Sequence, residues 1–143
     1  MQAIFEYYDK DLRAIFRSYA AANTKAGLND TETLDKVDLN ELAYMMKEGG
    51  MMDDHLTGVK LTSIFAAVNS GADEEGVDDD ADELVYDEFL PCLAMICDAK
   101  VPEHTRGGEP FEYTLHAWLQ LVFLPRYKLL LKEKRKGTQK KTL

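Results

Sequence analysis

The chain has 143 residues, a common size for a single domain, and its 45% of hydrophobic residues is enough for a substantial core. Its 26 acidic residues outnumber its 17 lysines and arginines, which gives a net charge of −9. The charge is uneven, with −16 over residues 1–125 and +7 over 126–143. An acidic body repels phosphate, so the composition argues against a nucleic-acid-binding protein. The basic end suits an acidic protein surface, an anionic membrane or the acidic body itself.

No segment has the features of a signal peptide or a membrane span. The start, MQAIFEYYDKDLR, carries acids where a signal peptide is basic and then apolar, and the apolar run AWLQLVFLP is too short to cross a bilayer. We therefore expect a cytoplasmic protein that does not contact membranes. Cys92 and Cys97 have neither redox-pair nor metal-site spacing, so we expect two buried thiols in a reducing compartment.

The first expected helix covers about 3–21, where apolar residues recur at helical spacing. These residues are Ile4, Tyr8, Leu12, Ile15, Phe16 and Tyr19. After a polar loop, a second helix is expected to begin at Asp38, which forms a capping-box pattern with Glu41 three positions later. Gly49 and Gly50 are expected to end it.

A third helix is expected to open at Thr57 and to stop at 69–71, where Asn, Ser and Gly follow one another. A strongly acidic loop, GADEEGVDDDADE, then leads to a short apolar run over 84–86. Asp87 is expected to cap a fourth helix over 88–100.

The rest of the chain divides into a linker over 100–109, a helix over 110–136 and a basic tail over 137–143. Pro110 suits the first helical position, because the N–H that it lacks is not needed there. Pro125 is expected to kink the helix, because an interior proline removes a hydrogen bond and clashes with the preceding turn.

The sequence from 12 to 98 contains two similar halves. Each has an apolar helix, IFRSYA or IFAAVN, then a polar loop, a β-prone residue and a helix start, VDLNEL or LVYDEF. This arrangement resembles the EF-hand pair of the calmodulin superfamily, with one hand over 3–48 and another over 56–99. The resemblance implies an all-α fold, in which a domain over 1–99 has four helices and a short β-bridge, followed by the long C-terminal helix.

The resemblance also assigns roles to three equivalent pairs of residues. They are Val37 and Leu84 in the β-bridge, Glu41 and Glu88 at the bidentate calcium-ligand position, and Leu42 and Phe89 at the start of the exiting helices.

Both loops depart from the calcium-binding pattern. They are about ten and eight residues longer than the twelve-residue EF-hand loop. Counting back from Glu41 places Leu34 at a ligand position and Asp35 where the sharp turn needs glycine. We therefore expect degenerate hands without a metal ion or cofactor. If calcium does bind, the expected ligands are Asp30, Glu32, Asp38 and Glu41 in the first loop, and Asp73, Asp78, Asp79, Asp80, Asp82 and Glu88 in the second.

Two groups of residues are candidates for contact with a partner. Methionines line the target groove of calcium sensors, so the cluster at the end of the second helix is one group, although a role in the core is favoured over it. The basic C-terminal residues are the other. The candidates are Met45, Met46, Met51, Met52, Arg126, Lys128, Lys132, Lys134, Arg135 and Lys136.

We expect no catalysis, because the histidines lack ligand spacing and no nucleotide-binding, metalloprotease or serine-hydrolase motif is present. The favoured function is a calcium-independent adaptor or scaffold, whose groove takes an amphipathic helix, with the helix over 111–124 filling it in cis. The stretched loops and extra helix are similar in style to ciliary and flagellar proteins. That likeness implies an axonemal location, a larger assembly, and tubulin or axonemal components as partners.

The alternative function is a calcium sensor or buffer with lengthened loops. A weaker alternative is membrane attachment through the basic, partly apolar segment 126–136. Under either main hypothesis the core is the same. It is expected to contain Leu12, Ile15, Phe16, Tyr19, Val37, Leu42, Met45, Leu61, Ile64, Phe65, Leu84, Phe89, Leu93, Ile96, Leu115, Trp118 and Val122.

Overall fold

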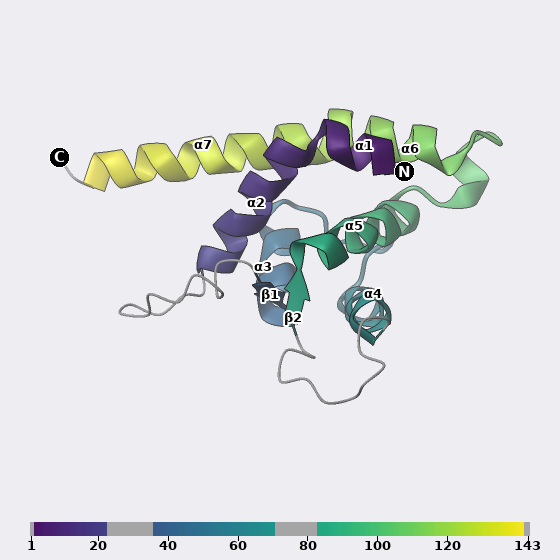
Figure 1. Ribbon diagram of the computed structural model, residues 1–143, viewed down its shortest axis with the longest axis horizontal. Helices are drawn as coiled ribbons and strands as arrows, with labels where there is room; N and C mark the ends of the chain where they lie inside the picture. Colours follow the sequence, from purple (N-terminus) through teal and green to yellow (C-terminus); the bar gives the residue numbers. More distant parts are fainter. Residues whose placement is uncertain (1, 23–35, 71–82, 142–143) are drawn as a thin grey trace.

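The computed structural model describes residues 2–22, 36–70 and 83–141, and it is mostly helical (Figure 1). Two short strands and several helices follow one another along the chain. The elements are α1 (Gln2–Tyr7), α2 (Asp9–Ala22), β1 (Lys36–Asp38), α3 (Leu39–Glu48), α4 (Gly58–Ser70), β2 (Glu83–Val85), α5 (Tyr86–Lys100), a 3-10 turn (Glu103–Thr105), α6 (Phe111–Trp118), a π turn (Leu119–Phe123) and α7 (Leu124–Lys141). The single helix expected over 3–21 is divided in two at Tyr8.

The two strands form one antiparallel pair. Val37 lies opposite Leu84, which is the pairing that the repeat predicted, and both side chains are fully buried. Because the strands are antiparallel and each leads directly into a helix, α3 and α5 begin at opposite ends of this pair.

The starts of α3, α4 and α5 were predicted with different success. Asp38 is the N-cap of α3, as expected, and Thr57 accepts a hydrogen bond from the backbone N–H of Lys60 at 3.1 Å at the start of α4. The prediction that Asp87 caps the fourth helix was wrong, because α5 begins at Tyr86, two residues before the expected start at 88. Val85 is the N-cap of α5 and offers no side-chain acceptor.

The core matches the predicted one except at a single residue. Sixteen of the seventeen predicted core side chains are buried, whereas Val122 is 44% exposed. Further buried residues include Phe5, Leu56, Cys92, Cys97, Phe123 and Tyr127.

The C-terminal helix explains the exception. It does not end at Pro125 but continues from α6 through the π turn into α7. In the π turn the backbone N–H of Leu124 bonds to the carbonyl of Leu119, five residues back. The extra residue in this turn shifts the following residues, so Phe123 and Tyr127 face the core in place of Val122. The tail expected over 137–143 is helical as far as Lys141.

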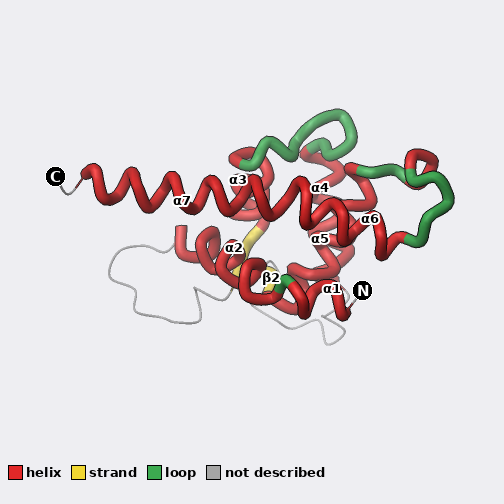
Figure 2. The backbone as a smooth tube through the Cα atoms, turned by 90° about the horizontal axis from the view of Figure 1, so that it is seen from above, coloured by secondary structure: helices red, strands yellow, loops and turns green. Residues whose placement is uncertain are grey.

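The α6–α7 helix lies along one edge of the molecule and packs on α2 and α5 (Figures 1 and 2). The C-terminal part of α7 extends beyond the other helices in both views. Within the described ranges, no helix combines the length and the apolar character that a bilayer span requires.

Candidate functional site

The two glutamates expected at the calcium-ligand position, Glu41 and Glu88, lie in the first turns of the helices that follow the paired strands. Glu41 accepts a hydrogen bond from the backbone N–H of Asp38 at 2.8 Å, and the Asp38 carboxylate accepts one from the N–H of Glu41 at 2.7 Å. In the second half, Glu88 accepts from the N–H of Val85 at 3.0 Å. Each glutamate therefore bonds to its own helix start, where backbone N–H groups lack partners within the helix.

Glu41 is the buried member of the pair, with an exposed fraction of 9%. Burial raises the pKa of its carboxyl to about 7, and the nearby charges of Asp38 and Glu83 act in the same direction. The hydrogen bond from the Asp38 backbone acts in the opposite direction and lowers this pKa. Around neutral pH, Glu41 therefore exists in both protonation states.

The remaining calcium candidates, Asp30 and Glu32 in the first loop and five aspartates in the second, lie outside the described residues. These five are Asp73, Asp78, Asp79, Asp80 and Asp82. Within the ranges that the structure describes, no group of three or more histidine, cysteine or carboxylate side chains is arranged to hold a metal ion.

The methionine cluster is placed in the core. Met45 and Met46 are fully buried, Met51 is 3% exposed, and Met52 is partly buried against the same core. The hypothesis of a partner contact is therefore wrong for Met45, Met46 and Met51, which present almost no surface, whereas the favoured core role is confirmed for these three. Their flexible side chains instead fill the space between α3 and the neighbouring helices.

The basic residues of α7 divide into two groups. Arg126, Lys128 and Lys134 are tied to the body: the Arg126 Nε donates to the Gly49 carbonyl at 2.9 Å, and Lys128 pairs with Asp11 at 3.0 Å. Lys134 pairs with Glu48 at 3.0 Å and lies 4.2 Å from the centre of the Tyr19 ring. Lys132 is exposed, and the side chains of Arg135 and Lys136 are outside the described set.

Tyr127 is the site residue that sequence reasoning missed. It is fully buried, and its hydroxyl donates to the Met45 carbonyl at 2.5 Å, near the end of α3. Its ring occupies the space where a side chain at Gly49 would stand. The only signals in the sequence were a tyrosine in an otherwise basic stretch and the pair Gly49 and Gly50, which was interpreted as the end of a helix.

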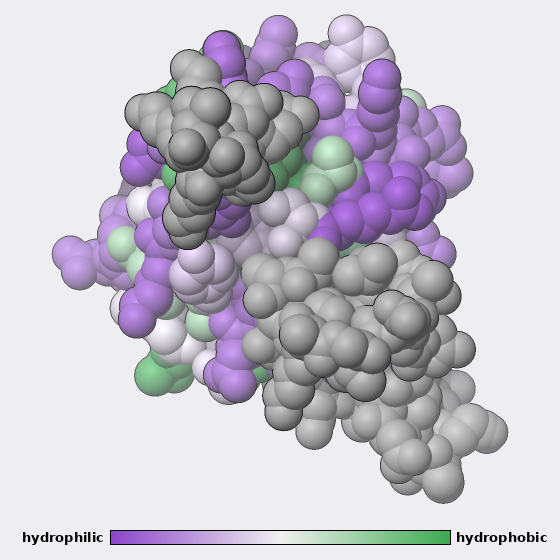
Figure 3. Space-filling view, turned by 90° about the vertical axis from the view of Figure 1, so that its left-hand side faces the viewer, coloured by the Kyte–Doolittle hydropathy of each residue, from purple (hydrophilic) through white to green (hydrophobic). Residues whose placement is uncertain are grey.

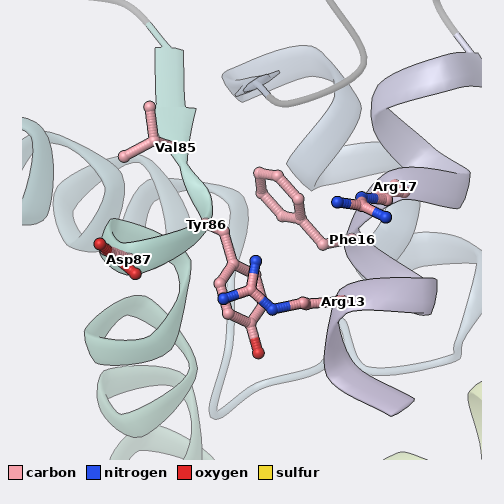
Figure 4. Close-up of a pocket in the computed structure, with 6 residues that line it drawn as sticks. All are labelled: Arg13, Phe16, Arg17, Val85, Tyr86 and Asp87. Atoms are coloured by element: carbon pink, nitrogen blue, oxygen red, sulfur yellow. The ribbon is translucent and has the colours of Figure 1, made fainter. Parts of the chain in front are cut away.

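A shallow hollow lies between α2 and the start of α5 (Figure 4). The Arg13 guanidinium stacks over the Tyr86 ring, 4.2 Å from its centre. Tyr86 donates to Asp9 at 3.1 Å, and the same carboxylate accepts from the Arg13 Nε at 2.9 Å. Burial and this hydrogen bond raise the pKa of Tyr86. These polar groups bond to one another, so their main role is to hold α2 against α5.

The two cysteines and His116 have packing roles. Burial raises the pKa of both Cys92 and Cys97 to about 12, so each thiol stays protonated at physiological pH. His116 lies beside Tyr8, with its Nε2 3.5 Å from the tyrosine hydroxyl.

Seen from the end where α7 terminates, the visible surface is mostly hydrophilic, and its hydrophobic residues lie in small scattered patches (Figure 3). Comparison with protein-family models, with curated proteins and with solved structures found no match to this chain.

Proposed function

We propose that this chain is a non-catalytic, protein-binding adaptor built on a pair of degenerate EF-hands. The observation that carries the proposal is the shared geometry of Glu41 and Glu88. Each lies three residues after the N-cap residue of its helix and accepts a hydrogen bond from the backbone N–H of that residue. The two helices follow the strands in which Val37 pairs with Leu84. In a working EF-hand, the equivalent glutamate closes the loop around calcium. Here both carboxylates instead stabilise the starts of α3 and α5.

The C-terminal helix of the chain packs against the pair of degenerate hands. Leu115, Trp118, Leu119, Phe123 and Tyr127 are buried where this helix meets the body. A groove that is filled in cis needs no ion to hold its shape, so the adaptor keeps one conformation at any calcium concentration. The surface left for a partner is then the acidic body and the exposed basic side of α7.

The partner that fits this basic side is a protein with an acidic surface, within a larger cytoplasmic assembly. The likeness in style to ciliary and flagellar proteins suggests an axonemal component, and tubulin offers an acidic surface. Lys132 is exposed, and residues 135–141 add further positive charge to the helix by sequence. Such contacts increase the association rate and weaken as salt is added.

Calorimetric titration of calcium in magnesium-containing buffer tests the calcium-independent part of the proposal. We expect no stoichiometric heat and no increase in the binding of an apolar dye, because a sensor exposes apolar surface when it takes up calcium. A one-site or two-site heat together with dye binding would instead establish the calcium-sensor alternative.

Co-sedimentation with microtubules tests the partner. Deleting 126–143 would also remove the buried Tyr127, so charge reversal is the cleaner change. We expect the double variant Lys132→Glu/Lys136→Glu to lose most of its binding. The matched control Lys10→Glu/Lys60→Glu, at exposed lysines of α2 and α4, has the same change in charge and should keep it. Unchanged binding by the double variant would remove tubulin as the partner of α7 and leave the calcium result unaffected.

A further inference from the structure

A row of exposed apolar side chains runs along the outward side of the α6–α7 helix. Tyr113, Leu121 and Leu129 are 64%, 72% and 51% exposed. Ala117 and Pro125 are also exposed and complete the row at a constant spacing of four residues. We call these five residues the outer row. The same helix buries its opposite side in the core, so it carries two apolar faces.

Two apolar faces on one helix indicate two packing partners, because an amphipathic helix at the surface normally exposes only polar residues on its second side. The body supplies the first partner. Val122, 44% exposed, widens the apolar surface beside Leu121. In Figures 1 and 2, no other described element covers the outward side of α6–α7.

The π turn reduces the winding of the outer row around the helix. In a regular α-helix, four residues make slightly more than one turn, so a row with this spacing winds around the axis. The π turn over Leu119–Phe123 winds more slowly per residue, and it lies at the middle of the row. Leu121 and Pro125 therefore stay closer to the line of Tyr113 and Leu129 than they would in a regular helix.

The outer row is also symmetrical about Leu121. If a second copy of the helix lies antiparallel, with its Leu121 against the first, Tyr113 faces Leu129 and Ala117 faces Pro125. Each contact then places a large side chain against a large one, or a small side chain against a small ring. This self-complementarity is the property that a two-fold interface requires.

The charges beside the row favour the same partner. In this register, Glu112 of one copy lies within about half a turn of Lys132 of the other, and both residues are exposed. The exposed charge is acidic at the start of α6 and basic along α7, so an antiparallel pair brings opposite charges together whereas a parallel pair opposes like charges.

We propose that the outer row pairs with the same row of a second copy of this chain, forming a two-fold symmetric, antiparallel dimer centred on Leu121. The dimer does not use the β-bridge, and it shares only Lys132 with the adaptor proposal. Leu121 takes no part in the adaptor proposal, so the Leu121→Asp test distinguishes failure of the dimer from failure of the adaptor. A single helix pair buries less than the roughly 1,200 Å² of smaller stable complexes, so the dissociation constant is expected in the micromolar range or weaker.

Sedimentation equilibrium of the full chain, from about 1 µM to about 1 mM, tests the dimer against the affinity expected from its interface size. We expect the average mass to rise with concentration from 16.2 kDa toward twice that value. Leu121→Asp should weaken association by at least about tenfold, because it buries a charge at the two-fold axis. The control Val59→Asp, at an exposed apolar residue of α4, should associate like the wild type.

Leu121 is exposed, so its replacement should leave the helical circular-dichroism spectrum unchanged. A wild-type chain that stays at the monomer mass over the whole range would overturn the proposal and leave the outer row to a different protein. The proposal also fails if Leu121→Asp and Val59→Asp weaken association equally.

Disulfide trapping tests the antiparallel register independently of affinity. Leu121→Cys should form a covalent dimer with itself under mild oxidation, whereas Val59→Cys should not. Tyr113→Cys and Leu129→Cys should each cross-link poorly alone and well when the two variants are mixed. The buried native thiols serve as the common background. Efficient self-linking by Tyr113→Cys would indicate a parallel pair and contradict the proposal.

Charge exchange completes the test. Glu112→Lys and Lys132→Glu should each weaken association several-fold, and the double variant should restore it, because each residue then again meets the opposite charge on the other copy. A double variant weaker than both single variants would exclude this register.

Discussion

Gly49 illustrates how one residue positions a helix that lies far away in sequence. A Cβ atom built at this position would overlap the Oη and Cζ atoms of Tyr127. The Tyr127 hydroxyl and the Arg126 guanidinium both donate to backbone carbonyls at the end of α3. The Met45 carbonyl also accepts from the backbone N–H of Gly49 at 3.1 Å. Both carbonyls lie at the negative end of the helix dipole, so a hydroxyl and a cation suit them well.

Gly49→Ala should destabilise the fold by about 1–3 kcal/mol, because the Tyr127 ring is held in the core and can move little. Urea unfolding measures this free energy. The matched control is Gly58→Ala at the first residue of α4, where a Cβ atom would meet nothing within 4 Å. It should change the free energy of unfolding by less than about 1 kcal/mol. Equal losses in both variants would contradict the close packing of Tyr127.

Glu41 should make stability depend on pH. Its pKa is about 7 in the fold, above the ordinary 4.5, so the fold favours the protonated carboxyl. This contribution is fully present below pH 4.5 and is lost as the pH rises to about 7. Glu41→Gln keeps an oxygen acceptor for the Asp38 N–H and removes the titration.

The difference in unfolding free energy between Glu41→Gln and the wild type should therefore shift in favour of the variant by roughly 1–2 kcal/mol as the pH rises through this window. Urea unfolding at a series of pH values checks it. Parallel profiles for the two proteins would mean that Glu41 is ionised throughout.

At the scale of elements, local patterns predicted what local interactions determine. The Asp38–Glu41 cap, the pairing of Val37 with Leu84, and the core faces of α2 to α5 follow from spacing and residue type. These features depend on residues within a turn or two of one another, or on a repeat that is visible in the sequence.

The features that were missed depend on tertiary contacts. Tyr127 bonds to Met45 across 82 residues, and no periodicity relates the two. The methionines were offered as partner contacts because their residue type suits a groove, although a core role was favoured, and three of the four are buried in the core. The break at Tyr8 and the π turn each shift the phase of a helix, and a constant helical period cannot anticipate such a shift.

The phase shift can be measured directly by truncating neighbouring residues. Phe123→Ala should cost about 3–5 kcal/mol, because it empties a fully buried site. Val122→Ala should stay within about 0.5 kcal/mol, since Val122 is half-exposed and alanine favours helix. Chemical denaturation of both variants checks this, and a larger loss at Val122 would show that the helix is regular there.

At the scale of the whole molecule, the C-terminal helix is a structural part of the body. Ion pairs join it to α2 and α3 through Asp11 and Glu48, and Tyr127 joins it to the end of α3. The C-terminal part of α7 extends beyond the other helices (Figure 1). The molecule thus combines a compact acidic body with one projecting basic helix.

Two truncations distinguish these parts. A chain ending after Lys134 should keep its thermal midpoint within a few degrees, because it retains the buried contacts and the ion pairs. A chain ending after Leu124 loses Tyr127 and should be destabilised by at least about 3–5 kcal/mol, a large share of the stability of a small domain. Thermal melts followed by circular dichroism check this, and equal midpoints would show that α7 is dispensable.

The position of Trp118 gives the molecule a built-in optical reporter. It is the only tryptophan in the chain, it is 4% exposed, and its ring lies 5.2 Å from that of Phe123 beside the π turn. Its fluorescence therefore comes from the seam between the last helix and the rest of the protein. Release of that helix would bring the indole into water and shift its emission to longer wavelength. Binding of a partner at the C-terminal end of α7 would leave the emission wavelength unchanged.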